Sequence, residues 1–141
     1  MKRGVLIVLG SVLLSLVASV LLGRVALGVT PFGHAVVELR QDSSAAAQDR
    51  AERKYGNLLE TTTGTLRLTA FVLDPIAAII SGVFVGFWGG KRSPLLAALG
   101  IFPLAIFSVL TYPWLWPGML AGAFDVLAAA VASRVVSAIS V

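Results

Sequence analysis

Residues 5–22 read VLIVLGSVLLSLVASVLL, a continuous apolar run that contains no charged side chain. As an α-helix this run is about 27 Å long, close to the roughly 30 Å thickness of the hydrocarbon core of a bilayer. Lys2 and Arg3 precede the run and Arg24 follows it, so charges flank it on both sides. The run is longer than the apolar core of a secretory signal peptide, which has about 7–15 residues. We therefore predict a retained transmembrane helix over residues 1–23.

Three further apolar stretches follow in the second half of the chain, and with the first they predict four membrane spans. They cover residues 75–90, 94–111 and 117–137. The fold class expected from this pattern is all-α: a polytopic membrane protein, built as a four-transmembrane-helix bundle with one extracytoplasmic loop domain. The expected segments are the first helix (1–23), the loop domain (24–69) and the other three transmembrane helices (70–141).

The start of the second span has two interpretations. Asp74-Pro75 has the form of an N-cap followed by the first residue of a helix. A helix from Pro75 to Gly90 is only about 24 Å long, which is short for a bilayer. Either the helix begins upstream, near Leu66, and kinks at Pro75, or the span is short and begins at a capped break. In both cases Asp74 lies where the backbone is interrupted, and an N-cap is its simplest role.

The composition indicates a chain surrounded by lipid. Hydrophobic residues make up 57% of the sequence and charged residues only 13%, against about 25% charged residues in soluble domains. A soluble protein of 141 residues has too much surface for its volume to bury so much apolar area. The net charge of +4 comes without a dense basic stripe, so we expect no nucleic-acid partner. We also expect no metal and no cofactor, because there is no cysteine and His34 is the single histidine.

Residues 24–69 are the only hydrophilic segment of any size. Ser43 or Ser44 is expected to cap a short amphipathic helix, and Gly56 is expected to end it. Threonine and leucine alternate in residues 65–69. This pattern suits either extended structure or a short amphipathic lead into the second span.

The positions of the basic residues predict that both termini are cytoplasmic. Five Lys and Arg residues lie on the proposed inner side and six on the outer side, so their number does not decide. The inner ones lie at the ends of spans without acidic neighbours, and they are Lys2, Arg3, Lys91, Arg92 and Arg134. Most of the outer ones lie among acidic residues in the loop domain. The expected location is the inner (plasma) membrane of a bacterium, because the chain is rich in Ala, Val and Arg and its loop lacks a glycosylation sequon.

Small residues form a stripe along one face of three of the four spans. In lipid, close approach of such residues is a main route to helix association. The stripes either pack within one bundle or leave one face for another subunit. The candidates for helix packing or a partner interface are Ser11, Ser15 and Ser19 on the first span, Gly82, Gly86 and Gly90 on the second, and Gly118 and Gly122 on the fourth.

Asp125 is the acidic residue that most needs explaining, because it lies within the fourth span. A carboxylate that faces lipid at mid-membrane costs about 2.5–3.5 kcal/mol on insertion scales, so we expect Asp125 to point into the bundle. It is either a proton or cation site or a structural carboxyl that bonds Ser or Thr, or pairs with Arg24. Asp74 lies in the same half of the membrane, and the two acids could form a pair that Arg24 and Arg67 neutralise.

The sequence contains no Walker-type loop, dinucleotide fingerprint, metal-ligand cluster or nucleophile elbow. We therefore expect no catalytic residue and no enzymatic activity. The first hypothesis is a non-catalytic subunit or assembly component of a membrane complex, which binds other integral membrane subunits or a second copy of itself through glycine-rich helix faces. The second is a small oligomeric transporter or channel with Asp125 as its proton or ion site. In both, lipid is a partner.

Overall fold

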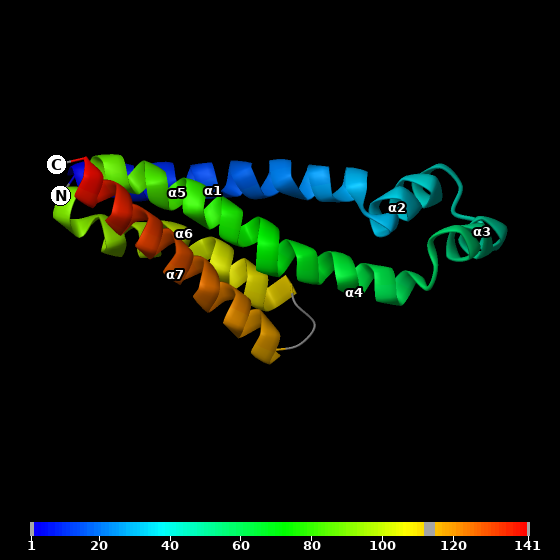
Figure 1. Cartoon of the computed structure of the whole chain (residues 1–141). Helices are drawn as coiled ribbons and strands as arrows, with labels where there is room; N and C mark the ends of the chain where they lie inside the picture. Colours follow the sequence, from blue (N-terminus) through cyan, green and yellow to red (C-terminus); the bar gives the residue numbers. More distant parts are fainter. Residues whose placement is uncertain (1, 112–114, 141) are drawn as a thin grey trace.

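The chain folds into helices along its described length, which comprises residues 2–111 and 115–140 of this computed structural model (Figure 1). Helices account for 95% of the described residues, and these contain no strand, which confirms the all-α class. In chain order the elements are α1 (Lys2–Val29), α2 (Pro31–Gln41), α3 (Ala45–Tyr55), α4 (Leu58–Leu68), the π-helical turn η1 (Thr69–Leu73), α5 (Asp74–Gly89), the 3-10 turn η2 (Gly90–Arg92), α6 (Ser93–Thr111) and α7 (Leu115–Ile139).

Three of the described helical segments are long and apolar enough to cross a membrane, and they are Lys2–Val29, Leu58–Leu110 and Trp116–Ile139. The middle segment is not one straight rod, because the chain reverses at η2 and α6 returns beside α5 (Figure 1). Gly90 at this reversal has a φ of 56°, in the left-handed region that favours glycine. Nothing lies within 4 Å of where its Cβ would be. Gly90 therefore serves the turn rather than helix packing.

The π-helical turn η1 joins α4 to α5 without a break, so the three elements form one continuous helical rod. The amide of Asp74 donates to the carbonyl of Thr69, five residues back. Pro75 follows directly and has no amide hydrogen to donate. The second apolar helix thus begins upstream of Pro75, as in the first of the two predicted alternatives.

Two expectations for this segment are wrong. Asp74 is not an N-cap, because its backbone is helical (φ −65°, ψ −43°) and the helix upstream leaves no free helix start for it to cap. The extended alternative for residues 65–69 is also wrong. The Thr65 hydroxyl donates to the carbonyl of Thr61 (2.9 Å), and Thr69 donates to that of Thr65 (3.0 Å). These polar side chains are satisfied one turn back, so α4 stays helical as the lead into α5.

The interior of the bundle holds many small side chains, and its outside carries many large apolar ones. Ala77, Ala97 and Ala129 have no exposed surface. Leu6 and Leu13 on α1 are 68% and 66% exposed. A water-soluble protein buries its leucines in preference to alanines. The reverse arrangement suits a bundle whose surroundings are as apolar as its own surface.

Glycines of the predicted stripes lie where two helices meet. A Cβ at Gly82 on α5 would overlap the backbone of Ala129 on α7. Gly86 lies against α7 in the same way, one turn further along α5. A Cβ at Gly122 on α7 would lie 2.9 Å from the carbonyl oxygen of Ala105 on α6. A side chain at any of these positions would therefore push α7 away from its neighbour.

The serine stripe of α1 also faces inward. Ser11 Oγ lies 2.6 Å from the Oγ of Ser81 on α5, and both side chains are buried. Ser15 is buried and donates to the carbonyl of Val12 over 2.9 Å. Gly118 on α7 is buried as well. Most members of the predicted stripes are thus buried within this chain, whereas Gly90 is exposed.

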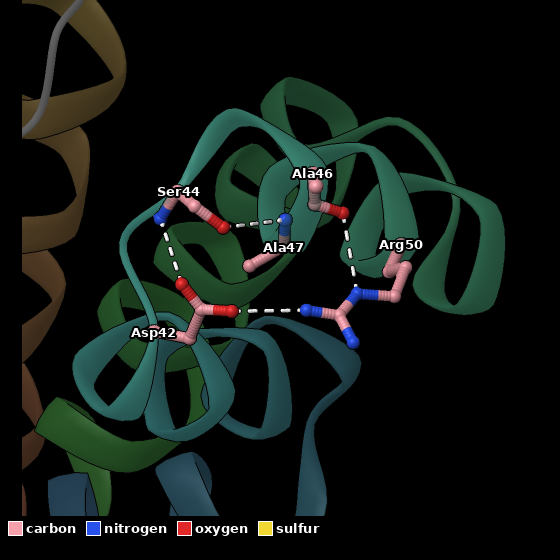
Figure 2. Close-up of polar contacts among 5 residues, drawn as sticks. All are labelled: Asp42, Ser44, Ala46, Ala47 and Arg50. Carbon is pink, nitrogen blue, oxygen red and sulfur yellow. Dashed lines mark hydrogen bonds and ion pairs between the residues drawn. The ribbon is translucent and has the colours of Figure 1, made fainter.

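Outside the apolar segments, α2 and α3 form a small helical hairpin that is fastened at its connection (Figure 2). The amide of Ala47 donates to Ser44 Oγ (3.2 Å), and the amide of Ser44 donates to Asp42 Oδ1 (3.0 Å). Arg50 Nη2 donates to Asp42 Oδ2 over 2.9 Å. Gly56 ends α3 with a φ of 83°. The predicted Ser44 cap and Gly56 terminator are confirmed.

Glu38 joins the two helices of the hairpin. Its carboxylate accepts hydrogen bonds from Lys54 Nζ and from Tyr55 Oη (2.7 Å). The hydrogen bond from Lys54, and next that from Tyr55, holds the pKa of Glu38 below its ordinary value of 4.5. A carboxyl group whose pKa is lowered by folding stabilises the fold above its unfolded pKa. That stabilisation is lost as the pH falls through the folded pKa.

We therefore expect the hairpin to become less stable as the pH falls below 4.5 and then through the lowered pKa of Glu38. The measurement is hydrogen–deuterium exchange of residues 31–56, expressed as protection factors so that the intrinsic pH dependence cancels. Glu38→Gln has no carboxylate at this position and should be less protected than wild type already at neutral pH. Wild-type protection factors that stay constant down to about pH 3 would contradict the role of Glu38.

Candidate functional site

Two acidic side chains lie inside the bundle on neighbouring helices. Asp125 of α7 has no exposed surface, and Asp74 at the start of α5 is 8% exposed. Ser108 of α6 lies between them, with its Oγ 3.3 Å from Asp74 Oδ2 and 3.5 Å from Asp125 Oδ2. The structure thus brings together the two carboxyl groups that the sequence offered as a possible pair.

A fourth helix contributes to the same cluster. Ser19 Oγ on α1 donates to Asp74 Oδ1 over 3.5 Å. Each of α1, α5, α6 and α7 therefore supplies one side chain, and we call Ser19, Asp74, Ser108 and Asp125 the acidic site. Asp125 Oδ1 is buried and has no hydrogen-bond partner in the part of the chain that the structure describes. Burying such an atom costs about 1–3 kcal/mol, which a proton or a cation held by the carboxyl group would offset.

The number of hydrogen atoms at Ser108 restricts the protonation of the pair. A serine hydroxyl carries one hydrogen and accepts through its oxygen. Ser108 can donate to Asp74 or to Asp125, but not to both at once. Both contacts are hydrogen bonds together only when one carboxyl group is protonated and donates to Ser108 Oγ. The geometry fits a pair of acids that holds one proton between them.

The two arginines that the sequence placed with these acids lie elsewhere. Arg24 and Arg67 are exposed, and neither forms an ion pair with Asp74 or Asp125. Among the described residues, the ion pairs are both in the α2–α3 hairpin. The predicted neutralisation by arginine is therefore wrong. A guanidinium group is costly to desolvate, and the long side chain lets it stay outside the bundle.

Sequence reasoning did not find Ser108, and it gave Ser19 only a packing role. A single serine in an apolar helix gives no signal that distinguishes a hydrogen-bonding partner from a small packing residue. The partners of both serines lie on other helices, so only the assembled bundle identifies them.

A cavity of about 270 Å³ lies beside Asp74. Its walls are mostly apolar, and three members of the acidic site, Ser19, Asp74 and Ser108, also line it. Asp125 lies behind Ser108 and is fully buried. The acidic site is thus accessible from the side of Asp74 and closed on the side of Asp125.

No family model, curated protein or solved structure matches this chain. The chemistry of the acidic site is therefore argued from its own groups. The site offers two carboxyl groups and two hydroxyls, and the described residues include no group of three or more His, Cys, Asp or Glu that could hold a metal ion. Ca²⁺ prefers about 6–8 oxygen ligands. Four polar side chains are better suited to a proton or to a single positive charge.

Ser108→Ala is expected to destabilise the bundle by about 1–3 kcal/mol, because two buried carboxyl groups lose the hydroxyl that they share. Ser108→Thr keeps the hydroxyl and should stay close to wild type. The measurement is the free energy of unfolding in an SDS titration followed by circular dichroism. Ser137→Ala is the control, since it removes an exposed hydroxyl that bonds the carbonyl of Arg134. A Ser108→Ala variant as stable as this control would show that Ser108 does not stabilise the pair.

Proposed function

We propose that this chain is a small integral membrane protein that carries a proton or a monovalent cation across the bilayer at the acidic site. The observation that carries the proposal is the burial of Asp74 and Asp125 around the single hydroxyl of Ser108. No basic side chain among the described residues forms an ion pair with either acid. Ionisable groups within transmembrane segments are expensive to bury and commonly mark ion or proton paths. A transported proton or cation would supply the positive charge that the site lacks.

The proposal includes four membrane crossings. The apolar segment Leu58–Leu110 has 53 residues, and a straight helix of that length would measure about 80 Å, far more than a bilayer core. The reversal at η2 divides it into two antiparallel rods, α4–α5 and α6 (Figure 1). Together with α1 and α7, these two rods support the proposal of four spans. The α2–α3 hairpin then extends beyond one membrane surface.

We propose that the hairpin is extracytoplasmic and that both termini lie in the cytoplasm of a bacterial cell. The N-terminus and the η2 turn lie at the same end of the bundle (Figure 1). That end carries Lys2, Arg3, Lys91 and Arg92 and no acidic residue close to them in sequence. The positive-inside rule places such an end on the cytoplasmic side.

Cysteine labelling in intact cells tests this orientation, and the chain has no cysteine of its own. Asp49→Cys on α3 and Lys91→Cys on η2 replace exposed residues. We expect a membrane-impermeant maleimide to label the cysteine at position 49 in intact cells, and the one at position 91 only after permeabilisation. The opposite pattern would invert the proposed topology. Labelling of both positions, 49 and 91, in intact cells would contradict the four-span arrangement.

Transport is tested in liposomes that contain the purified protein and a pH-sensitive dye. A potassium diffusion potential drives protons inward, and parallel vesicles receive a sodium or potassium gradient together with an indicator for that ion. We expect the protein to accelerate the dissipation of at least one gradient relative to empty vesicles. Rates equal to those of empty vesicles for all three ions would contradict the proposed function.

The role as a subunit of a membrane complex stays a prediction. Its supporting feature was the set of glycine-rich faces, and Gly82, Gly86 and Gly122 lie against other helices of this chain. These contacts leave that role without an assigned surface. Co-purification of stoichiometric membrane subunits after mild solubilisation remains the measurement that would support it.

A further inference from the structure

The cavity beside Asp74 opens on the apolar outer surface of the bundle, where a molecule dissolved in the bilayer could enter. Leu16 and Val20 on α1 and Phe107 on α6 line it and are 45%, 60% and 61% exposed. The cavity therefore opens between the outer faces of two helices whose surroundings, in the proposed arrangement, are acyl chains. A molecule that enters by this route must first dissolve in lipid.

The polar groups of the cavity gather around one carboxyl group. Ser19 Oγ and Ser108 Oγ both contact Asp74, at 3.5 Å and 3.3 Å. The remaining walls are mostly apolar. Asp125 lies behind Ser108, so the region is acidic and no Lys or Arg pairs with it among the described residues. An anionic headgroup would be repelled by this region, whereas a cationic hydrogen-bond donor would be attracted to it.

We propose that this cavity binds a small hydrophobic amine, whose protonated nitrogen pairs with Asp74 and whose apolar part lies against Leu16, Leu104 and Phe107. The volume of about 270 Å³ falls just below the usual range of ligand pockets, which begins at about 300 Å³, so the ligand is small. The inference rests on the proposed function, because the amine occupies the same carboxyl group as the transported proton or cation. It adds a substrate class: lipid-soluble organic cations.

The test uses the full-length protein in nanodiscs and two probes of equal shape. N,N-dimethylnaphthylmethylamine carries the cationic nitrogen, and isobutylnaphthalene has a CH group in its place. Binding is measured by isothermal titration against empty nanodiscs, which corrects for partition into lipid. We expect the amine to bind at least about tenfold more tightly than the hydrocarbon, as a charge-assisted hydrogen bond to a buried carboxylate requires.

Three variants locate the site. Asp74→Asn should abolish the preference for the amine. Val20→Trp adds bulk at the mouth of the cavity and should weaken both probes at least about tenfold. Val17→Trp is the matched control, because Val17 is also exposed on α1 but does not line the cavity. Equal binding of the two probes, or an unchanged affinity of Val20→Trp, would overturn the proposal. Val20→Trp keeps the test decisive if Asp74→Asn does not fold.

The outcomes separate the two proposals. Ion flux in liposomes with no preference for the amine would refute the binding site and leave the proposed transport in place. Selective amine binding without flux of any tested ion would refute ion transport and support the cavity as a binding site.

Discussion

Asp125→Asn is expected to lower ion flux through the reconstituted protein by about a hundredfold or more. A positioned side chain that exchanges protons contributes about 10²–10⁴-fold to the rate of a proton-transfer step. Asparagine has the same shape as aspartate and can still bond Ser108, but it neither carries a charge nor releases a proton. The variant thus removes the chemistry and preserves the packing. Flux is measured in the dye-loaded vesicles at equal protein content.

Two controls accompany this variant: a second substitution, Asp49→Asn, and the stability of Asp125→Asn itself. Asp49→Asn removes a carboxyl group from exposed α3 and should leave flux unchanged. Asp125→Asn itself should be at least as stable as wild type, because it removes a buried acid with one unpaired oxygen. If Asp125→Asn retained wild-type flux, the role of Asp125 would be structural. A variant that fails to fold would contradict the expected stability.

Gly82→Leu is expected to prevent formation of the native bundle. A Cβ at this position would overlap the backbone of Ala129, and backbone cannot move aside as a flexible side chain can. Overpacking a tight core costs about 1–3 kcal/mol for extra methylene groups, and a backbone clash lies at or above that range. We expect a loss of about 3 kcal/mol or more in the free energy of unfolding in SDS, together with aggregation during size-exclusion chromatography in detergent.

Gly23→Leu is the matched control for this prediction. Gly23 also lies within a long apolar helix, α1, but no atom lies within 4 Å of where its Cβ would be. The same substitution therefore adds the same side chain into open space. We expect it to change stability by less than about 0.5 kcal/mol. If Gly82→Leu were as stable as Gly23→Leu, the close packing of α5 on α7 would be wrong.

The class of the fold could be predicted from the sequence because apolar runs and small-residue spacing are local patterns. Helix continuity around Pro75 could not be settled in this way. The π-helical turn that carries the chain through this position depends on hydrogen bonds five residues apart, which have no distinctive sequence signal. The N-cap expected at Asp74 failed for the same reason, since a cap forms only where a helix begins.

For the acidic site, the sequence identified its two charged members but left the partner of Asp125 open between a Ser or Thr side chain and Arg24. An acid within an apolar helix is conspicuous, whereas a serine is common there. Opposite charges also suggested that Arg24 and Arg67 neutralise the pair of acids. Arg24 and Arg67 are exposed instead, and serines on α1 and α6 contact the acids. Which groups meet is decided by how four helices are rotated against one another, and a single sequence does not contain that information in a readable form.

The π-helical turn η1 contains more residues per turn than an α-helix, and it lies directly before Asp74. The winding of this turn therefore sets how α4 is rotated relative to Asp74 and α5. An α-helix advances about 100° per residue, so a change from π to α winding just before Asp74 would rotate α4 by roughly that angle relative to α5. Few backbone hydrogen bonds would change partners in such a step. The hairpin of α2 and α3, which is attached to α4, would turn with it. In the proposed arrangement, a twist applied to the hairpin would thereby reach a carboxyl group between the membrane spans.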